Sequence, residues 1–175
     1  MKGINTKKLA LASLLGGISA MLEIIPGIPF DVPFPLYNRV SWDLTGVPMM
    51  ISLMSTSLMG AVYTVLIGCS FIFLRGNISG GIFKIIAELS TIIVFALIRK
   101  TFIAKSFGSI ISRITIMTGV NYFFLQIFYG LPTSFVIGIL PALAILNASQ
   151  ALINIIPAKI IYSRISDSRL LRFDS

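Results

Sequence analysis

Long apolar stretches, separated by short connections, take up most of this chain and restrict its fold to one class. Hydrophobic residues make up 56% of the 175 residues and charged residues only 11%, whereas about a quarter of a soluble domain is charged. A bilayer core requires about 20 apolar residues for each helix that crosses it. The chain therefore has room for a handful of such helices and for no soluble catalytic domain. We predict an all-α integral membrane protein that crosses the cell (plasma) membrane several times.

The apolar stretch 44–74 decides the number of spans in the single membrane domain predicted over residues 1–175. Its 31 residues are too many for one ordinary span and few for two. Ser52, Thr56 and Ser57 lie near its middle, where a tight turn could separate two helices. We therefore expect six spans, at about 9–25, 44–57, 58–74, 79–98, 107–129 and 134–162.

The distribution of basic residues favours this number. With six spans, eleven of the 14 Lys and Arg residues lie on the same side as both chain ends, and Arg39, Arg75 and Lys84 lie on the other. If 44–74 formed one span instead, only five of the Lys and Arg residues would be cytoplasmic and nine would lie outside. Basic residues are enriched on the cytoplasmic side of membrane proteins. The count predicts cytoplasmic N- and C-termini, and it explains the net charge of +8 without nucleic acid as a partner.

The first apolar stretch has a second interpretation, as a signal peptide. Three lysines precede it, and Ser19 and Ala20 are small residues of the kind found near a cleavage site. The apolar run continues as far as Ile25, which favours a membrane helix.

Residues 26–43 interrupt the helical pattern. Four prolines oppose helix formation and favour an extended loop. The loop also carries Phe34, Tyr37 and Trp42, which is unusually aromatic for a solvated connection. We expect it to cover a ligand pocket in the outer half of the bundle.

Several kinds of chemistry are excluded by composition. The chain has no His and only one Cys, so it has no internal disulfide, no CxxC redox pair and no His/Cys metal site. Gly76, Gly80 and Gly81 are followed by Ile82 and not by the Lys-Ser/Thr of a phosphate loop. We expect neither an enzyme nor a bound cofactor. Uphill transport would need a gradient or an ATP-hydrolysing partner.

Three amide side chains lie deep inside the last two apolar stretches: Asn121, Asn147 and Gln150. Polar groups at membrane depth are costly unless they are paired, so they usually mark a helix contact or a ligand path. Asn147, Gln150 and Asn154 share one helix face, because they are spaced i, i+3 and i+7. That face could bind a ligand, or it could join helices through hydrogen bonds.

Three short segments of the sequence resemble motifs of a known protein family. Residues 42–48 (WDLTGVP) resemble an Asp-Phe-Ser-Asp-Ile-Pro element, residues 117–122 (MTGVNY) a Met-Thr-x-x-Asn-Tyr pattern, and residues 146–150 (LNASQ) a Phe-Asn-x-x-Lys pattern. In this order and spacing, the segments resemble the substrate-binding S component of an energy-coupling factor (ECF) vitamin transporter, closest to the riboflavin-type members.

The resemblance implies a subunit that captures a vitamin at the outer face, with riboflavin as the leading ligand. Its partners would be a T component and two ABC ATPase subunits, all working in the lipid bilayer. Asn121, Asn147 and Gln150 would contact the ligand, although riboflavin-type members have a lysine where Gln150 stands. The alternatives are another vitamin or heteroaromatic nutrient, or a stand-alone small-molecule carrier.

Lys84 and Glu88 are charged residues one helical turn apart inside the fourth expected span. They could neutralise each other as a structural i, i+4 pair. Alternatively, they could belong to the ligand site, where Lys84 would supply the cation that is missing at position 150.

Small residues form two rows along the first expected helix: Ala12, Gly16 and Ala20, and beside them Ser13 and Gly17. Such rows let another helix approach closely. The neighbour could be a helix of this chain, whereas the resemblance implies docking onto the T component.

Overall fold

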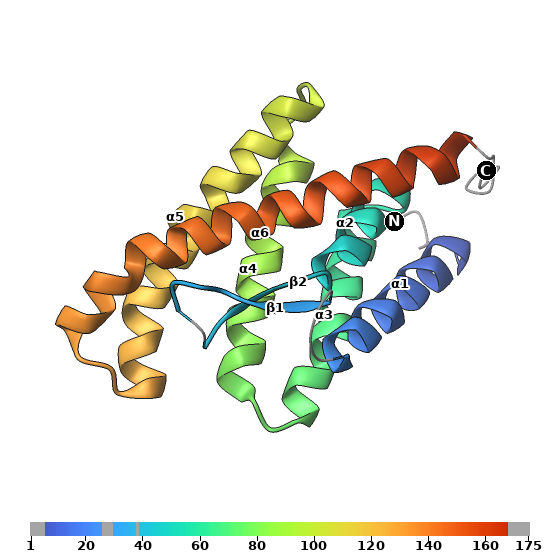
Figure 1. Ribbon diagram of the computed structural model, residues 1–175. Coiled ribbons are helices and arrows are strands. Elements are labelled where there is room, and N and C mark those ends of the chain that lie inside the picture. Colours follow the sequence, from blue (N-terminus) through green and yellow to red (C-terminus); the bar gives the residue numbers. More distant parts are fainter. Residues whose placement is uncertain (1–5, 26–29, 38, 168–175) are drawn as a thin grey trace.

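A computed structural model describes residues 6–25, 30–37 and 39–167 of the chain. It contains six helices and one short hairpin of two strands (Figure 1). In chain order the elements are α1 (Thr6–Ile24), β1 (Asp31–Pro33), β2 (Ser41–Asp43), α2 (Gly46–Ser55), α3 (Leu58–Leu74), α4 (Ile78–Leu97), α5 (Phe102–Tyr129) and α6 (Thr133–Asp167). The six helices confirm the predicted helical bundle. The predicted cytoplasmic chain ends lie outside the described residues.

The apolar stretch 44–74 forms two helices, α2 and α3, as its hydroxyl residues predict. α2 ends at Ser55, and the side chain of Ser57 caps α3 by accepting a hydrogen bond from Gly60 N at 3.2 Å. α2 has only ten residues and therefore rises about 15 Å, half the thickness of a bilayer core. It is a short buried helix and not a full span.

Three of the described helices, α4, α5 and α6, are long and apolar enough to cross a membrane. α6 has 35 residues, so it rises about 53 Å and exceeds the thickness of a bilayer core. It lies obliquely across the bundle and packs against α5 and α2 (Figure 1). α1 packs mainly on α3, and α4 lies between α3 and α5.

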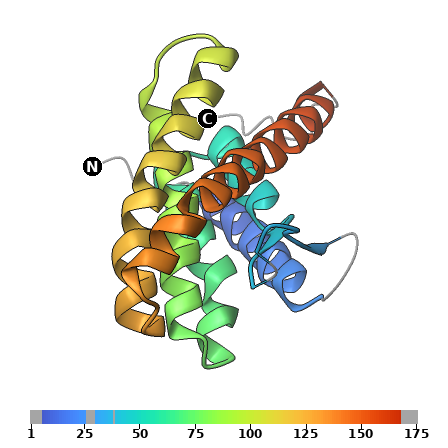
Figure 2. The same cartoon turned by 60° about the vertical axis from the view of Figure 1, so that its left-hand side comes forward.

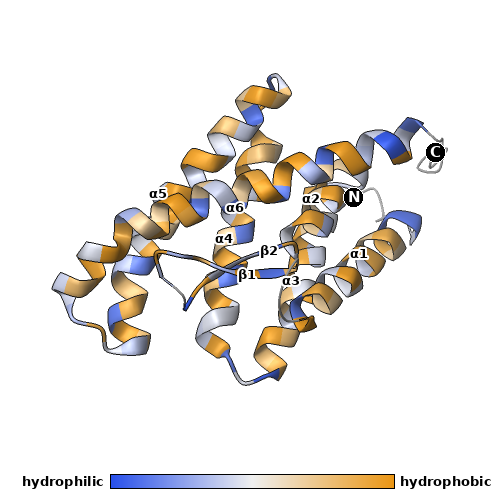
Figure 3. Ribbon diagram, in the orientation of Figure 1, coloured by the Kyte–Doolittle hydropathy of each residue, from blue (hydrophilic) through white to orange (hydrophobic). Residues whose placement is uncertain are grey.

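The bundle has an apolar core that also holds polar groups, and its outer surface is largely apolar. Large apolar side chains such as Leu14, Met59 and Ile127 are more than half exposed, whereas Glu88, Asn154 and Thr64 are fully buried. Figure 3 shows hydrophobic residues along every helix, and hydrophilic residues concentrated towards helix ends and connections. Such an apolar outer surface suits a lipid environment, and the buried polar groups must find partners within the protein.

The segment predicted as an extended loop is a hairpin where it is described. β1 and β2 pair antiparallel, with Val32 opposite Trp42. The hairpin lies on the outside of the bundle, close to α1 and α6 (Figure 2). Pro33 is tolerated because a strand in a two-stranded sheet has one unpaired edge.

Candidate ligand-binding site

A cavity of about 320 Å³ lies between α4, α5, α6 and the hairpin. The hairpin contributes Tyr37, Val40, Ser41 and Asp43 to its wall. Five of the residues predicted to bind ligand line it: Tyr37, Lys84, Asn121, Asn147 and Gln150. Segments that are far apart in the sequence therefore converge on one chamber.

Asn121 presents an unused amide to this cavity. Its side chain is only 6% exposed, and no other described residue forms a hydrogen bond with that amide. The amide nitrogen and oxygen remain accessible, because Ser55 Oγ is the one fully buried side-chain polar atom among the described residues that lacks a hydrogen-bond partner. A ligand that occupied the cavity could form the missing hydrogen bonds.

Arg113 is a functional candidate that sequence analysis missed. It lines the cavity and is 3% exposed. Its guanidinium donates from Nη1 to Glu88 Oε1 at 3.0 Å and to Thr91 Oγ1 at 3.3 Å, and from Nε to Asn147 Oδ1 at 3.3 Å. The signal was present in the sequence, because a buried glutamate in a membrane helix requires a cation.

Glu88 is fully buried and is not among the residues that line the cavity. Its second oxygen, Oε2, accepts a hydrogen bond from Asn154 Nδ2 at 2.8 Å. Of the two alternatives for Lys84 and Glu88, the mutual ion pair is wrong, because Glu88 forms its ion pair with Arg113 and Lys84 forms one with Asp43 of the hairpin. Glu88 therefore acts beneath the cavity, where it holds Arg113.

Gln150 uses its amide to hold the hairpin. Its Nε2 donates to Asp43 O at 2.7 Å and to Asn154 Oδ1 at 2.9 Å, and its Oε1 accepts from Asp43 N at 3.1 Å. Gln150 thus pairs with the backbone of β2 as a neighbouring strand would. Its side chain borders the cavity, but both of its amide hydrogens are already used.

Asp43 is the second anchor of the hairpin. Its carboxylate binds the Lys84 ammonium and accepts a hydrogen bond from Thr45 N at 2.9 Å. Burial acts to raise the pKa of Asp43, but the Lys84 charge and the hydrogen bonds from Lys84 and Thr45 outweigh it, so that pKa lies below its ordinary value of 3.8. Asp43 is therefore ionised at neutral pH, and its stabilising contribution is lost only as the pH falls through the lowered pKa.

Phe34 and Trp42, two predicted ligand contacts, instead pack the hairpin onto the bundle. They are not among the residues that line the cavity. Trp42 Nε1 donates to Ser149 Oγ of α6 at 2.7 Å, and the Phe34 and Trp42 rings meet edge to face with centroids 5.0 Å apart. Of the three aromatic residues predicted from this segment, only Tyr37 faces the cavity.

The two rows of small residues on α1 face different neighbours. Ala12 is fully buried, and a Cβ at Gly16 would lie 2.8 Å from the Cβ of Ile67 in α3. A Cβ at Gly17 would have no neighbour within 4 Å. Ser13, Gly17 and Ala20 are partly exposed. Ala12 and Gly16 therefore pack within this chain, which corrects their assignment to partner docking, and Ser13, Gly17 and Ala20 remain available.

Comparison with solved structures identifies the architecture. One solved structure, described as the structure and mechanism of the S component of a bacterial ECF transporter, matches 93% of this chain and 96% of that chain, with a TM-score of 0.78 and 22% sequence identity. The chain has the fold of an ECF S component. No family model and no curated protein matches the sequence. At this identity the S-component likeness establishes the fold, and the ligand has to be inferred from the cavity.

Proposed function

We propose that this chain is the substrate-binding S component of an ECF-type importer, with a T component and two ABC ATPases as its partners. The observation that carries the proposal is the partly open cavity beside the hairpin, in a bundle that has the S-component fold. Its wall includes the Asn121 amide, to which no other described residue forms a hydrogen bond. The absence of a phosphate-loop motif in the sequence is consistent with energy supplied by a partner.

The position of the cavity suits capture from outside the cell. Asn77, Tyr129 and Leu131 place it towards the α3–α4 and α5–α6 connections. The opposite end of the bundle carries Lys100 and Lys159, which the positive-inside rule assigns to the cytoplasm. A ligand would enter from the outer side, where the hairpin covers the chamber.

We propose a small planar heteroaromatic vitamin as the ligand, with riboflavin as the leading candidate. The cavity of about 320 Å³ lies at the lower end of the range of small-molecule pockets, about 300–1,000 Å³. Tyr37, Phe83 and Tyr129 offer ring surfaces, and Asn121 and Asn147 offer amides for the edges of a ring system. Lys84 and Arg113 add N–H donors to the wall, and their charges are balanced by Asp43 and Glu88.

Mass spectrometry of small molecules that co-purify with the detergent-solubilised protein would test the ligand. A yellow preparation that releases a flavin would support riboflavin. Release of a different heteroaromatic nutrient would be consistent with the S-component role but would contradict riboflavin as the ligand. Transport by the purified chain in liposomes without any ATPase would contradict the S-component role itself.

Asn121→Ala should weaken ligand binding by about one to two orders of magnitude, because a hydrogen bond to a buried amide is lost. Titration of the co-purifying small molecule measures the affinity. Gln126→Ala is the matched control, since Gln126 lies on the same helix and its side chain forms hydrogen bonds with Tyr122 O and Thr133 Oγ1 and does not line the cavity. Equal affinities for wild type and Asn121→Ala would remove Asn121 from the site.

Gly17→Leu should prevent co-purification with the T component while ligand binding by the isolated subunit survives. The added side chain would project from the partly exposed row of α1, where a Cβ meets no neighbour within the chain. Gly16→Leu is the informative contrast, because it collides with Ile67 and should lower thermal stability. If Gly17→Leu leaves the complex intact, this row is not the docking surface.

A further inference from the structure

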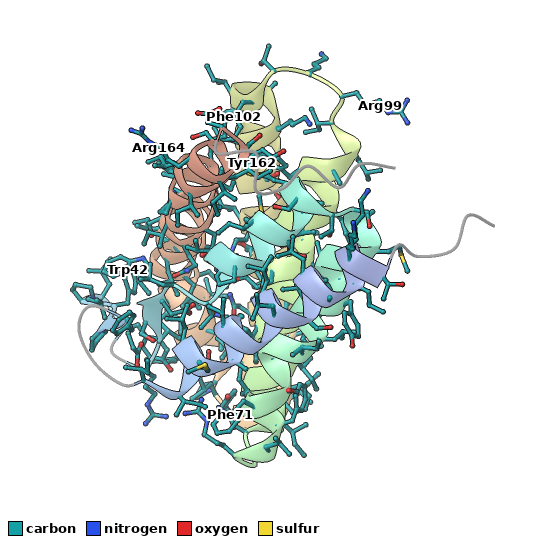
Figure 4. All side chains as sticks on the ribbon, turned by 90° about the vertical axis from the view of Figure 1, so that its right-hand side faces the viewer. Trp42, Phe71, Arg99, Phe102, Tyr162 and Arg164 are labelled. Carbon is teal, nitrogen blue, oxygen red and sulfur yellow. The ribbon has the colours of Figure 1, made fainter. Side chains whose placement is uncertain are left out.

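A second hollow, of about 630 Å³, lies at the end of the bundle opposite the ligand cavity. Ends of α2, α3, α4, α5 and α6 surround it. Phe102 and Tyr162 lie near one another at this end, with Arg164 to one side and Arg99 farther away on the other (Figure 4).

The walls of this hollow combine apolar side chains with three ammonium groups. Leu53, Met54 and Leu58 contribute aliphatic surface from α2 and α3, and Lys100, Lys105 and Lys159 contribute the charges. None of these lysines forms an ion pair with a described carboxylate. Among the described residues, the lining includes no acidic side chain. The hollow is therefore both apolar and strongly cationic.

Aromatic rings hold two of the ammonium groups at defined positions. Lys105 Nζ lies 5.5 Å from the centre of the Phe95 ring, and Lys159 Nζ lies 5.7 Å from that of Phe102 and 6.0 Å from that of Tyr162. The Phe95 and Phe102 rings also meet edge to face, at 5.9 Å. Cation–π contacts restrict the flexible lysine side chains without neutralising them. The ammonium groups of Lys105 and Lys159 are thus held at defined positions and can still bind an anion.

We propose that this hollow is a binding site for an anionic phospholipid. Its phosphate would lie among Lys100, Lys105 and Lys159, and its acyl chains would follow the aliphatic wall formed by α2, α3 and α4. A ligand with a negative head and an apolar tail complements both kinds of surface. Basic pockets between helices at the cytoplasmic side of membrane proteins bind such headgroups, and the basic residues assign this end to that side.

Lipid titrations on delipidated protein in detergent, followed by native mass spectrometry, would test the proposal. Phosphatidylglycerol should bind more tightly than phosphatidylcholine with the same acyl chains. Lys105→Gln/Lys159→Gln should weaken phosphatidylglycerol binding by about thirtyfold, because each basic residue near a headgroup contributes about a factor of five. Arg99→Gln/Arg164→Gln is the matched control, since it removes two charges from the same end outside the lining, and it should retain most of the affinity.

Three results would overturn the proposal. Equal binding of the two lipids would indicate ordinary boundary lipid. Equal weakening by the two double variants would indicate a diffuse electrostatic field and not this hollow. Displacement of the lipid by glycerol 3-phosphate at comparable concentration would indicate a site for small anions. Unchanged melting temperatures of both variants in phosphatidylcholine would verify that they fold.

Discussion

Glu88→Gln should reduce the free energy of unfolding by about 3–5 kcal/mol, because it leaves the Arg113 guanidinium buried without a counter-ion. Both side chains of this ion pair are at most 4% exposed, and the Nη1–Oε1 distance is 3.0 Å. Glutamine keeps the size and shape of the side chain, so the loss does not come from packing. It reports the missing charge together with the missing acceptor, since both Glu88 oxygens accept hydrogen bonds, from Arg113 and from Asn154. Thermal or denaturant unfolding in detergent measures the effect.

Two further variants separate the burial of this pair from its charge. Glu23→Gln is the control, since its partner Arg75 is 47% exposed and an exposed pair contributes only about 0–1 kcal/mol. Glu88→Gln/Arg113→Gln removes both charges and should recover part of the stability lost in the single variant. A Glu88→Gln protein as stable as wild type would show that water or lipid reaches Arg113.

The positions of the helices could be predicted from the apolar pattern. An error in the predicted start of α5 meant that Arg113 was not recognised as a buried residue. The fifth span was predicted from residue 107, whereas α5 begins at Phe102, where Thr101 caps it by accepting from Ala104 N. With the later start, Arg113 was counted as a cytoplasmic residue near a helix end. With the observed start, it lies three turns inside the bundle and faces Glu88. The asymmetry of the remaining basic residues persists without Arg113 and Lys84.

The hairpin and its anchors could not be read from local sequence. Prolines and aromatic residues indicate an extended segment, but its position depends on contacts between Asp43 and Gln150, 107 residues apart in the chain. Gln150 lines the cavity, and its predicted ligand contact stays a prediction, whereas its hydrogen bonds to the hairpin backbone do not follow from the sequence pattern. Similarly, the spacing of small residues on α1 identifies two rows, but spacing does not say which row meets α3. The position of the hairpin and the row of α1 that contacts α3 are determined by tertiary packing.

Lys84→Met should weaken ligand binding by about one to two orders of magnitude, because a hydrogen bond from a charged donor contributes about 1.5–3 kcal/mol. Lys84 lines the cavity and its ammonium binds Asp43, with the two side chains 14% and 18% exposed. The substitution therefore removes the cation nearest the hairpin and leaves the Asp43 carboxylate unpaired at the cavity wall. Titration of the co-purifying small molecule measures the loss, and Lys105→Met, at the opposite end of the bundle, should bind normally.

The double variant Lys84→Met/Asp43→Asn distinguishes a direct ligand contact from support of the hairpin. Asparagine at position 43 can still accept the hydrogen bond from Thr45 N. It carries no charge, so the cavity wall is not left with an unpaired carboxylate. If Lys84 only holds the hairpin, the double variant should recover most of the affinity, because no unpaired charge remains. If Lys84 contacts the ligand, the double variant should bind as weakly as Lys84→Met. Wild-type affinity in the single variant would exclude both roles, and hairpin closure would then depend on Gln150 and Trp42.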